Sequence, residues 1–191
     1  MKSSNDAGKS SKAKANVNAY PAAWERNAQT LDGVAYRIRP IRVDDEEFER
    51  KFIMGLSPDS RYMRMMCAMR EPSPELLYQF VHVDYRNDMA FVALSGEPPD
   101  EQLIGVARYA RDASGADSEF AVAVSDAWQG RGVGATLTRL LFEYAREQGI
   151  HRLHGEILAN NQRMIELVHW LGMETQLCPD DAHLVQASRA P

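Results

Sequence analysis

The stretch that decides the fold of this chain is Glu119-Phe-Ala-Val-Ala-Val-Ser-Asp-Ala-Trp-Gln-Gly-Arg-Gly-Val-Gly-Ala135. It begins as an alternating apolar strand, passes through Gly130, Gly132 and Gly134, and continues into a helix. Glycine lets the backbone approach a ligand closely, because it has no Cβ atom. The first N–H groups of a helix have no intrahelical acceptor and lie at the positive end of the helix dipole. The stretch therefore predicts a phosphate or diphosphate site between a strand and a helix.

The glycine spacing argues against two common phosphate loops. A P-loop has Gly-Lys-Ser or Gly-Lys-Thr at the end of its glycine turn, and this stretch has neither. A dinucleotide fingerprint needs Gly-x-Gly-x-x-Gly and an acidic residue about 20 positions further on. Here the spacing is Gly-x-Gly-x-Gly, and Glu156 falls inside a predicted strand rather than at its end. A tight strand–helix packing turn that binds no ligand remains an alternative.

The periodicity around this stretch predicts a mixed α/β fold. Short turns separate three strands ahead of the glycines, which favours an antiparallel meander, since parallel pairing needs a long crossover. After the glycines the pattern is helix, strand, helix and two short strands, with one parallel β-α-β crossover near the middle of the sheet. The predicted strands are 34–39, 89–95, 103–111, 118–125, 151–158, 174–177 and 183–187. The predicted helices begin at Asp44 or Asp45, Ser57, Glu75, Val133 and Asn160.

Composition indicates one globular domain of 191 residues, with 45% hydrophobic and 26% charged residues. Residues 1–19 have little to bury and are predicted to be a disordered basic tail. Residues 20–33 are expected to be a connector that packs Tyr20 or Trp24 on the body, and residues 34–191 to be the domain. The tail carries +3, which leaves −8 for the rest against −5 for the whole chain. An acidic body argues against nucleic acid as the main partner.

The remaining patterns point to a cytoplasmic protein without a metal. No apolar run approaches the length of a membrane span, and no apolar segment follows the N-terminal lysines as in a secretory signal. The cysteines, Cys67 and Cys178, are far apart, which fits a reducing compartment; Cys67 is expected in the core. His151 and His154 lie three apart on a strand and face opposite sides, so no metal site is predicted.

At the glycines the chain resembles a known family. Val124 followed five residues later by Gln129-Gly-Arg-Gly-Val-Gly resembles the acetyl-CoA loop of the GNAT N-acetyltransferases. Asn161 and the later Leu171-Gly-Met173 are similar to the next helix of that family. Arg39-Pro-Ile41, Leu56-Ser-Pro-Asp-Ser-Arg-Tyr-Met-Arg64 and Glu119-Phe-Ala-Val122 resemble the bacterial protein lysine acetyltransferases of the Pat type, which modify acyl-CoA synthetases. The resemblance covers Val34 to about Ala187.

The resemblance implies a GNAT-type sheet with splayed parallel strands and acetyl-CoA as co-substrate, with no metal. Along the splayed strand, free backbone groups would bind the pantetheine amides, and one N–H would polarise the thioester oxygen. Arg131 and Arg163 would flank the coenzyme phosphates, and Arg61, Tyr62 and Arg64 would either line the acceptor side or be structural. The residues that the resemblance assigns to the coenzyme are Val122, Ala123, Val124, Gln129, Gly130, Arg131, Gly132, Val133, Gly134, Ala135 and Asn161.

The expected reaction is direct acetyl transfer to an amine. At pH 7 a lysine amine with a pKa of about 10.4 must lose a proton, which costs about 4.6 kcal/mol. Glu119 on the strand that leads into the glycines matches the general base of the family. Many family members have a tyrosine acid seven residues after the helix asparagine, but Val168 stands there, so no general acid is assigned.

The acceptor expected from the Pat-like strings is a protein lysine. The alternatives are a small amine, such as a polyamine or an antibiotic, and a non-catalytic module that senses acyl-CoA. A monomer and a dimer both remain open.

Overall fold

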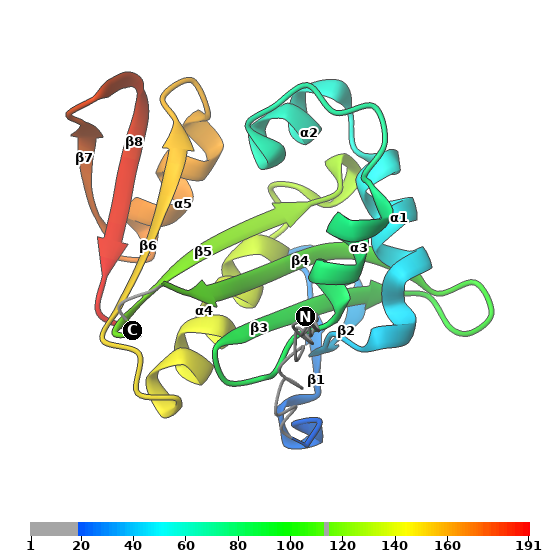
Figure 1. Ribbon diagram of the computed structural model, residues 1–191. Helices are drawn as coiled ribbons and strands as arrows, with labels where there is room; N and C mark the ends of the chain where they lie inside the picture. The colour runs from blue at the N-terminus through cyan, green and yellow to red at the C-terminus, as the bar shows by residue number, and fades with distance from the viewer. Residues whose placement is uncertain (1–18, 113–114) are drawn as a thin grey trace, which may run out of the picture.

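The computed structural model describes residues 19–112 and 115–191. Its eight-stranded sheet has the order β1-β2-β3-β4-β5-β6-β8-β7 (Figure 1). The strands are β1 Arg26–Gln29, β2 Ala35–Pro40, β3 Asp88–Ser95, β4 Gln102–Arg111, β5 Asp117–Val124, β6 Arg152–Leu158, β7 Glu174–Cys178 and β8 Asp181–Arg189. All neighbours are antiparallel except β5 and β6. The predicted mixed, mostly antiparallel sheet with one parallel crossover is confirmed.

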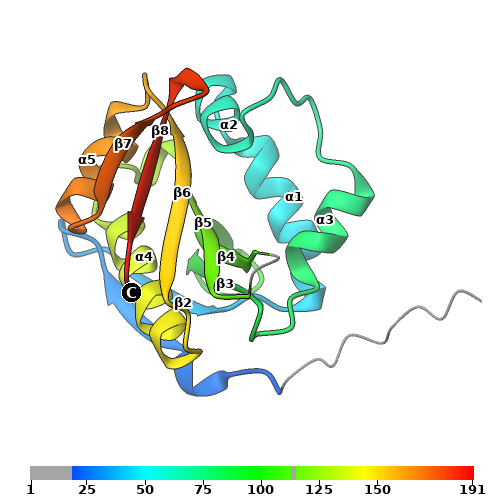
Figure 2. The ribbon, with the colours of Figure 1, turned by 60° about the vertical axis from the view of Figure 1, so that its left-hand side comes forward.

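The sheet consists of two leaves that meet only at the start of β5 and β6. The parallel pairing covers Asp117 to Glu119 of β5 against Arg152 to His154 of β6. Beyond these residues β5 continues along β4, whereas β6 continues along β8. The two strands therefore diverge, as Figures 1 and 2 show. This is the splay that the sequence resemblance implies, and it leaves one edge of β5 without a partner strand.

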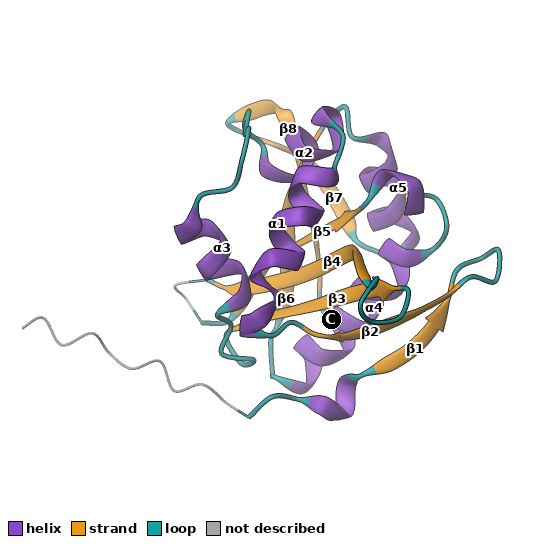
Figure 3. Ribbon diagram, turned by 90° about the vertical axis from the view of Figure 1, so that its right-hand side faces the viewer, coloured by secondary structure: helices purple, strands orange, loops and turns teal. Residues whose placement is uncertain are grey.

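Helices cover both faces of the leaf that β1 to β5 form. The helices are α1 Glu46–Gly55, α2 Pro58–Met65, α3 Pro74–Val81, α4 Val133–Glu147 and α5 Gln162–Trp170. Figure 3 shows α1 and α3 side by side on one face of the sheet. On that face Arg108 of β4 reaches Glu49 of α1. On the opposite face Tyr109, the next residue of β4, packs against Tyr144 of α4. This alternation is the two-residue period of a strand.

Local sequence signals place most helix ends. Ser57, Ser73 and Asn161 each occupy an N-cap, where the side-chain oxygen accepts the N–H three residues further on at 3.2 Å. Pro58 follows at the first helical position of α2, where its missing N–H costs nothing. None of the helices formed by the described residues is long and apolar enough to cross a membrane.

The segment expected as a connector is largely regular structure. Residues Ala22–Trp24 form a 3-10 turn, and Arg26–Gln29 form β1, which pairs with β2 at the edge of the sheet. Trp24 packs on the core as predicted, with its ring centroid 5.0 Å from that of Tyr144. The sequence hides β1 because an edge strand of four mostly exposed polar residues has no apolar alternation. The predicted tail lies, except for Ala19, outside the described residues.

Two further expectations concern Asp45 and Cys67. Asp45 is the N-cap residue of α1 as predicted, but its carboxylate makes no capping hydrogen bond to that helix. It binds the Arg39 guanidinium through two contacts of 2.6 Å in the core, because a buried cation needs a carboxylate more than a helix end needs a cap. Cys67 is exposed rather than buried, since the chain leaves α2 at Met66 in a left-handed conformation that turns it outward.

Candidate functional site

The glycine loop, Gln129–Ala135, has the backbone that its sequence predicts. Gly130 and Gly132 have φ angles of +71° and +88°, which side chains with a Cβ rarely adopt. Gly132 is the N-cap of α4, and the Thr136 N–H is bonded to its carbonyl at 3.0 Å. The amides of Val133, Gly134 and Ala135 therefore precede the first intrahelical bond and point out of the helix end. Together with the helix dipole they form a site for an anion.

Gln129 joins three elements around this loop. Its side-chain amide donates to the Val124 carbonyl at the end of β5 and to the Ser60 hydroxyl of α2, each at 3.0 Å. Its amide oxygen accepts from Arg163 of α5. The side chain of Gln129 is thus a structural junction, and only its backbone is available to a ligand.

Asp126 ties α2 to the same region. Its carboxylate accepts the N–H of Ser57 at 2.9 Å and the hydroxyls of Ser57 and Ser60 at 2.8 and 2.7 Å. Partial burial acts to raise the pKa of Asp126, but these hydrogen bonds outweigh it and lower the pKa below its usual value. The start of α2 is therefore held against the loop by an ionised carboxylate.

The free edge of β5 faces the gap between the two leaves. Ser125 donates its N–H to Ile104 of β4 at 2.9 Å, and the ladder pairs Ala123 with Val106. Because backbone groups alternate along a strand, the N–H and C=O of Ala123 also point toward β4. The groups of Val122 and the N–H of Val124 point toward the gap. Of the three residues expected to bind the pantetheine arm, Val122 and Val124 thus have backbone groups on the side of the gap, whereas the register uses those of Ala123 in the sheet.

A cleft of about 1220 Å³ runs from the glycine loop along this edge. Glu119 lies near the start of β5 and Val124 at its end, about 17 Å apart at the usual rise per strand residue. The glycine loop follows beyond Val124. Val133 is absent from the lining because its side chain is buried against Gly105. The predicted site residues that line the cleft are Glu119, Val122, Ala123, Val124, Gln129, Gly130, Arg131, Gly132, Gly134, Ala135 and Asn161.

Charged side chains from α1, α2 and β4 surround the Glu119 end of the cleft. Arg64 of α2 lines the cleft and interacts electrostatically with Glu119 and with the buried Glu49. Burial and the neighbouring Arg108 lower the pKa of Arg64 to about 10, so it remains a cation at neutral pH. Arg108 in turn binds Glu49 at 2.6 Å. Of these four charged residues, Arg64 and Glu119 line the cleft, and the Arg108–Glu49 pair lies largely buried behind them.

The other residues of the motif strings take structural roles. Arg61 donates to the carbonyls of Leu56 and Arg70 at 3.1 and 2.8 Å, so it joins the end of α1 to the segment after α2. Tyr62 is exposed and does not line the cleft. Arg131 binds Asp32 through contacts of 2.7 and 3.1 Å, which sequence reasoning missed. Val168, at the position of the family's tyrosine acid, is fully buried.

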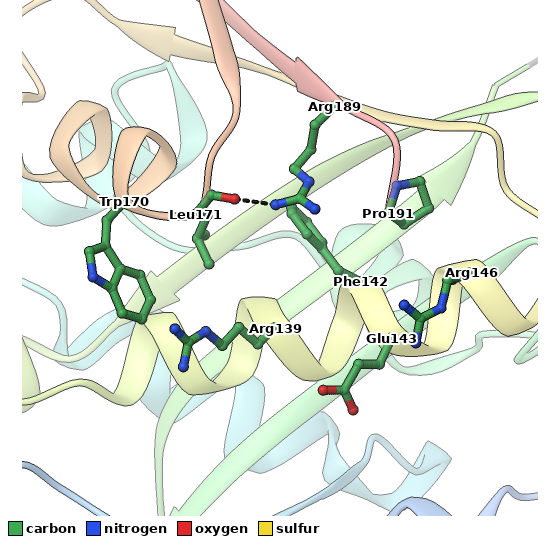
Figure 4. Close-up of a pocket in the computed structure, with 8 residues that line it drawn as sticks. All are labelled: Arg139, Phe142, Glu143, Arg146, Trp170, Leu171, Arg189 and Pro191. Atoms are coloured by element: carbon green, nitrogen blue, oxygen red, sulfur yellow. Dashed lines mark hydrogen bonds between the residues drawn. The ribbon is translucent and has the colours of Figure 1, made fainter.

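A smaller pocket of about 280 Å³ adjoins the cleft (Figure 4). It shares Arg139 and Trp170 with the cleft, and the Arg139 guanidinium lies 4.0 Å from the centre of the Trp170 ring. Arg189 closes its upper side and donates to the Leu171 carbonyl. Among the described residues, no group of three or more His, Cys, Asp or Glu side chains gathers to hold a metal ion.

Comparison with known proteins identifies the family. Residues 56–173 match the model of the acetyltransferase (GNAT) family. The chain belongs to the GNAT acetyltransferase family. It is therefore an acyltransferase, and the glycine loop, the splayed strands and the cleft are those of a GNAT fold. The members of this family use acetyl-CoA as co-substrate.

The chain is also similar in sequence to two acetyltransferases and in structure to one solved domain. The GNAT chain is 40% identical over 151 residues to the acetyltransferase PA5475 of Pseudomonas aeruginosa, with 79% of this chain and 81% of the relative aligned. It is 29% identical to the acetyltransferase Pat of Mycolicibacterium smegmatis over 75% of this chain, but over only 43% of Pat. The GNAT domain of S. lividans PAT has a TM-score of 0.83 and 31% identity, with 90% of this chain and 99% of that domain covered.

Proposed function

We propose that this GNAT protein transfers the acetyl group of acetyl-CoA directly to the side-chain amine of a protein lysine, with Glu119 as the general base. The observation that carries the proposal is the cleft. One open strand edge leads from a helix N-terminus that suits a diphosphate to a carboxylate that suits an amine. The similarity to PAT and Pat supports a protein acceptor.

The coenzyme would bind through backbone groups along its length. The amides that begin α4, those of Val133, Gly134 and Ala135, would hold the diphosphate. Beyond the loop, the pantetheine arm would lie along β5 as an added strand, hydrogen-bonded to the free groups of Val122 and Val124. The thioester then reaches the Glu119 end of the cleft. Asn161 lines this cleft while its side-chain oxygen caps α5, so its contribution is to fix the start of that helix.

The chemistry needs a neutral amine and a polarised thioester. Glu119 is exposed to the cleft, so it can take a proton from the lysine ammonium directly or through water. The amine then attacks the thioester carbon, and the N–H of Val122 stabilises the oxygen that gains charge. As the C–S bond breaks, the attacking nitrogen loses its second proton to the departing thiolate through water, which yields the amide and the coenzyme thiol. The coenzyme thiol has a pKa near 8.5, so its thiolate can depart without an acid. This agrees with the burial of Val168.

The experiment compares two carboxylates of the same cleft, Glu119 and Glu156. Acetyl-CoA turnover is measured with an acetylatable protein substrate, together with calorimetric binding of CoA. E119Q is expected to lower kcat by about 10²- to 10⁴-fold near pH 7 with unchanged CoA affinity, and to recover partly at high pH. E156Q, a matched change on β6, is expected to keep its turnover within about twofold. A loss in E156Q with full activity in E119Q would reject Glu119 as the base.

A further inference from the structure

The turn between β1 and β2, Thr30–Gly33, packs directly on the glycine loop. It lies outside residues 56–173, which match the family model. The Leu31 N–H donates to the Arg131 carbonyl at 3.0 Å. A Cβ on Gly132 would lie 3.2 Å from the Leu31 Cγ, so the missing side chain makes room for this turn. The turn therefore contacts the loop through both backbone and side chain.

The turn is itself held in one shape. Its ends are joined by hydrogen bonds of 2.9 Å between the Thr30 and Val34 backbones and between the Val34 N–H and the Thr30 hydroxyl. Gly33 adopts a φ of +86°, and its N–H donates to the Thr30 carbonyl. A turn with this many internal bonds can position neighbouring groups, since it loses little further freedom when a ligand binds.

Asp32 forms an ion pair with Arg131 of the glycine loop. Its carboxylate receives two hydrogen bonds from Arg131, whose guanidinium also lies 4.6 Å from the centre of the Trp128 ring. The hydrogen bonds from Arg131 lower the pKa of Asp32 to about 2, so the ion pair persists at neutral pH. Arg131 is thus held between a carboxylate and an aromatic ring.

The sheet register places this turn beyond the loop as seen from Glu119. The residue pairs across β2, β3, β4 and β5 align the start of β2 with the Val124 end of β5, whereas Glu119 aligns with the far end of β4. A coenzyme whose diphosphate sits on the loop and whose thioester reaches Glu119 would extend its nucleotide away from Glu119. The cleft there is lined by Gln29 and Leu31, and the Leu31 side chain is 85% exposed.

We propose that the turn Thr30–Gly33 is the outer wall of the subsite for the nucleotide part of the coenzyme. Leu31 covers that part of the ligand with apolar surface, and Asp32 is the positioning residue that holds Arg131 beside it. The inference rests on the proposed coenzyme site and extends it to residues outside the matched family region.

The test is calorimetric titration of CoA into wild type, L31S and D32A. Each variant is expected to weaken CoA binding by about three- to tenfold, because each loses a partly buried contact or a paired charge. E47A removes an exposed carboxylate that pairs with Arg50 on α1 and serves as the matched control, with unchanged affinity. Thermal midpoints of all variants show whether the fold is retained.

A second substrate separates the loss of a contact with the nucleotide from general damage to the glycine loop. Acetyl-4′-phosphopantetheine keeps the phosphate next to the pantetheine arm but lacks the nucleotide, so kcat/KM for it is expected to be the same in L31S, D32A and wild type. Equal CoA affinity in all proteins, or equal losses with acetyl-4′-phosphopantetheine, would overturn the role of the turn. If wild type binds CoA but transfers no acetyl group, the proposed reaction fails, while the titrations still decide the role of the turn.

Discussion

At the scale of single residues, two glycines at the ends of α4 have a backbone conformation that residues with a Cβ rarely adopt. Gly132 combines a φ of +88° with a side-chain neighbour, Leu31, 3.2 Å from where a Cβ would lie. Gly149 ends α4 with a similar φ of +70°, but nothing lies within 4 Å of its Cβ position. The two positions share the backbone strain and differ in their surroundings.

This pair gives a residue-scale prediction. G132A and G149A are each expected to lower the free energy of unfolding by about 1–2 kcal/mol, because both force a Cβ into the left-handed region. Only G132A is expected to weaken CoA binding as well, by about tenfold, since it moves the loop or the turn that packs on it. Urea unfolding and CoA titration measure the two effects. Intact CoA affinity in G132A would show that the loop tolerates a Cβ.

At the scale of elements, α2 stands out because one carboxylate anchors it. Five residues of the helix line the cleft, yet none of its residues is fully buried; the five are Asp59, Ser60, Met63, Arg64 and Met65. The hydrogen bonds that Asp126 accepts from Ser57 and Ser60 therefore contribute strongly to the position of its first turn. Such an element opens locally more easily than the core.

The anchor should respond to pH. The pKa of Asp126 is lowered in the folded protein from its usual 3.8, so its stabilising effect is complete above that value and is lost as the pH falls through the lowered pKa. Hydrogen exchange of the α2 amides, corrected for intrinsic rates, should therefore speed up only in that acidic range. At pH 7, D126N should raise exchange in α2 by about tenfold. D44N, a change at an exposed aspartate, should not; equal exchange in both would refute the anchor.

At the scale of the whole molecule, the two leaves of the sheet meet at Gly155. A Cβ there would lie 2.9 Å from the Phe120 carbonyl and 3.0 Å from its ring, closer than real contacts allow. The absence of a side chain lets β6 approach β5 at the last residues before they diverge. The close approach at Gly155 thus contributes to the width of the cleft, because the two strands diverge from this junction.

The corresponding prediction concerns both stability and the cleft. G155A is expected to lower the free energy of unfolding by about 1–3 kcal/mol, because the extra methyl group overpacks a closed junction. It should also weaken CoA binding, since β6 moves away from β5. G55A on α1, where nothing lies within 4 Å, is the control and should be neutral or slightly stabilising. A G155A protein as stable as wild type would mean that the junction can adjust.

The sequence alone determined the features that short stretches encode. The glycine loop, the cap Ser57 and the parallel crossover were all predictable, because turn chemistry, helix capping and hydrophobic period act within a few residues. The resemblance to the GNAT family, confirmed by the comparisons, rested on the same local strings. The roles of Glu119 and of the coenzyme residues stay predictions that the cleft geometry supports.

Only the tertiary structure decided which side chains and backbone groups are free to bind a ligand and which are already hydrogen-bonded within the protein. Arg131 is 99 positions from its partner Asp32, and Asp126 is 69 positions from Ser57, so no local pattern records either pair. The backbone of Ala123 turns toward β4 rather than the cleft because of a register set across a hairpin. Hydrogen bonds and ion pairs depend on distances in space, and these are fixed by packing between segments that the sequence keeps far apart.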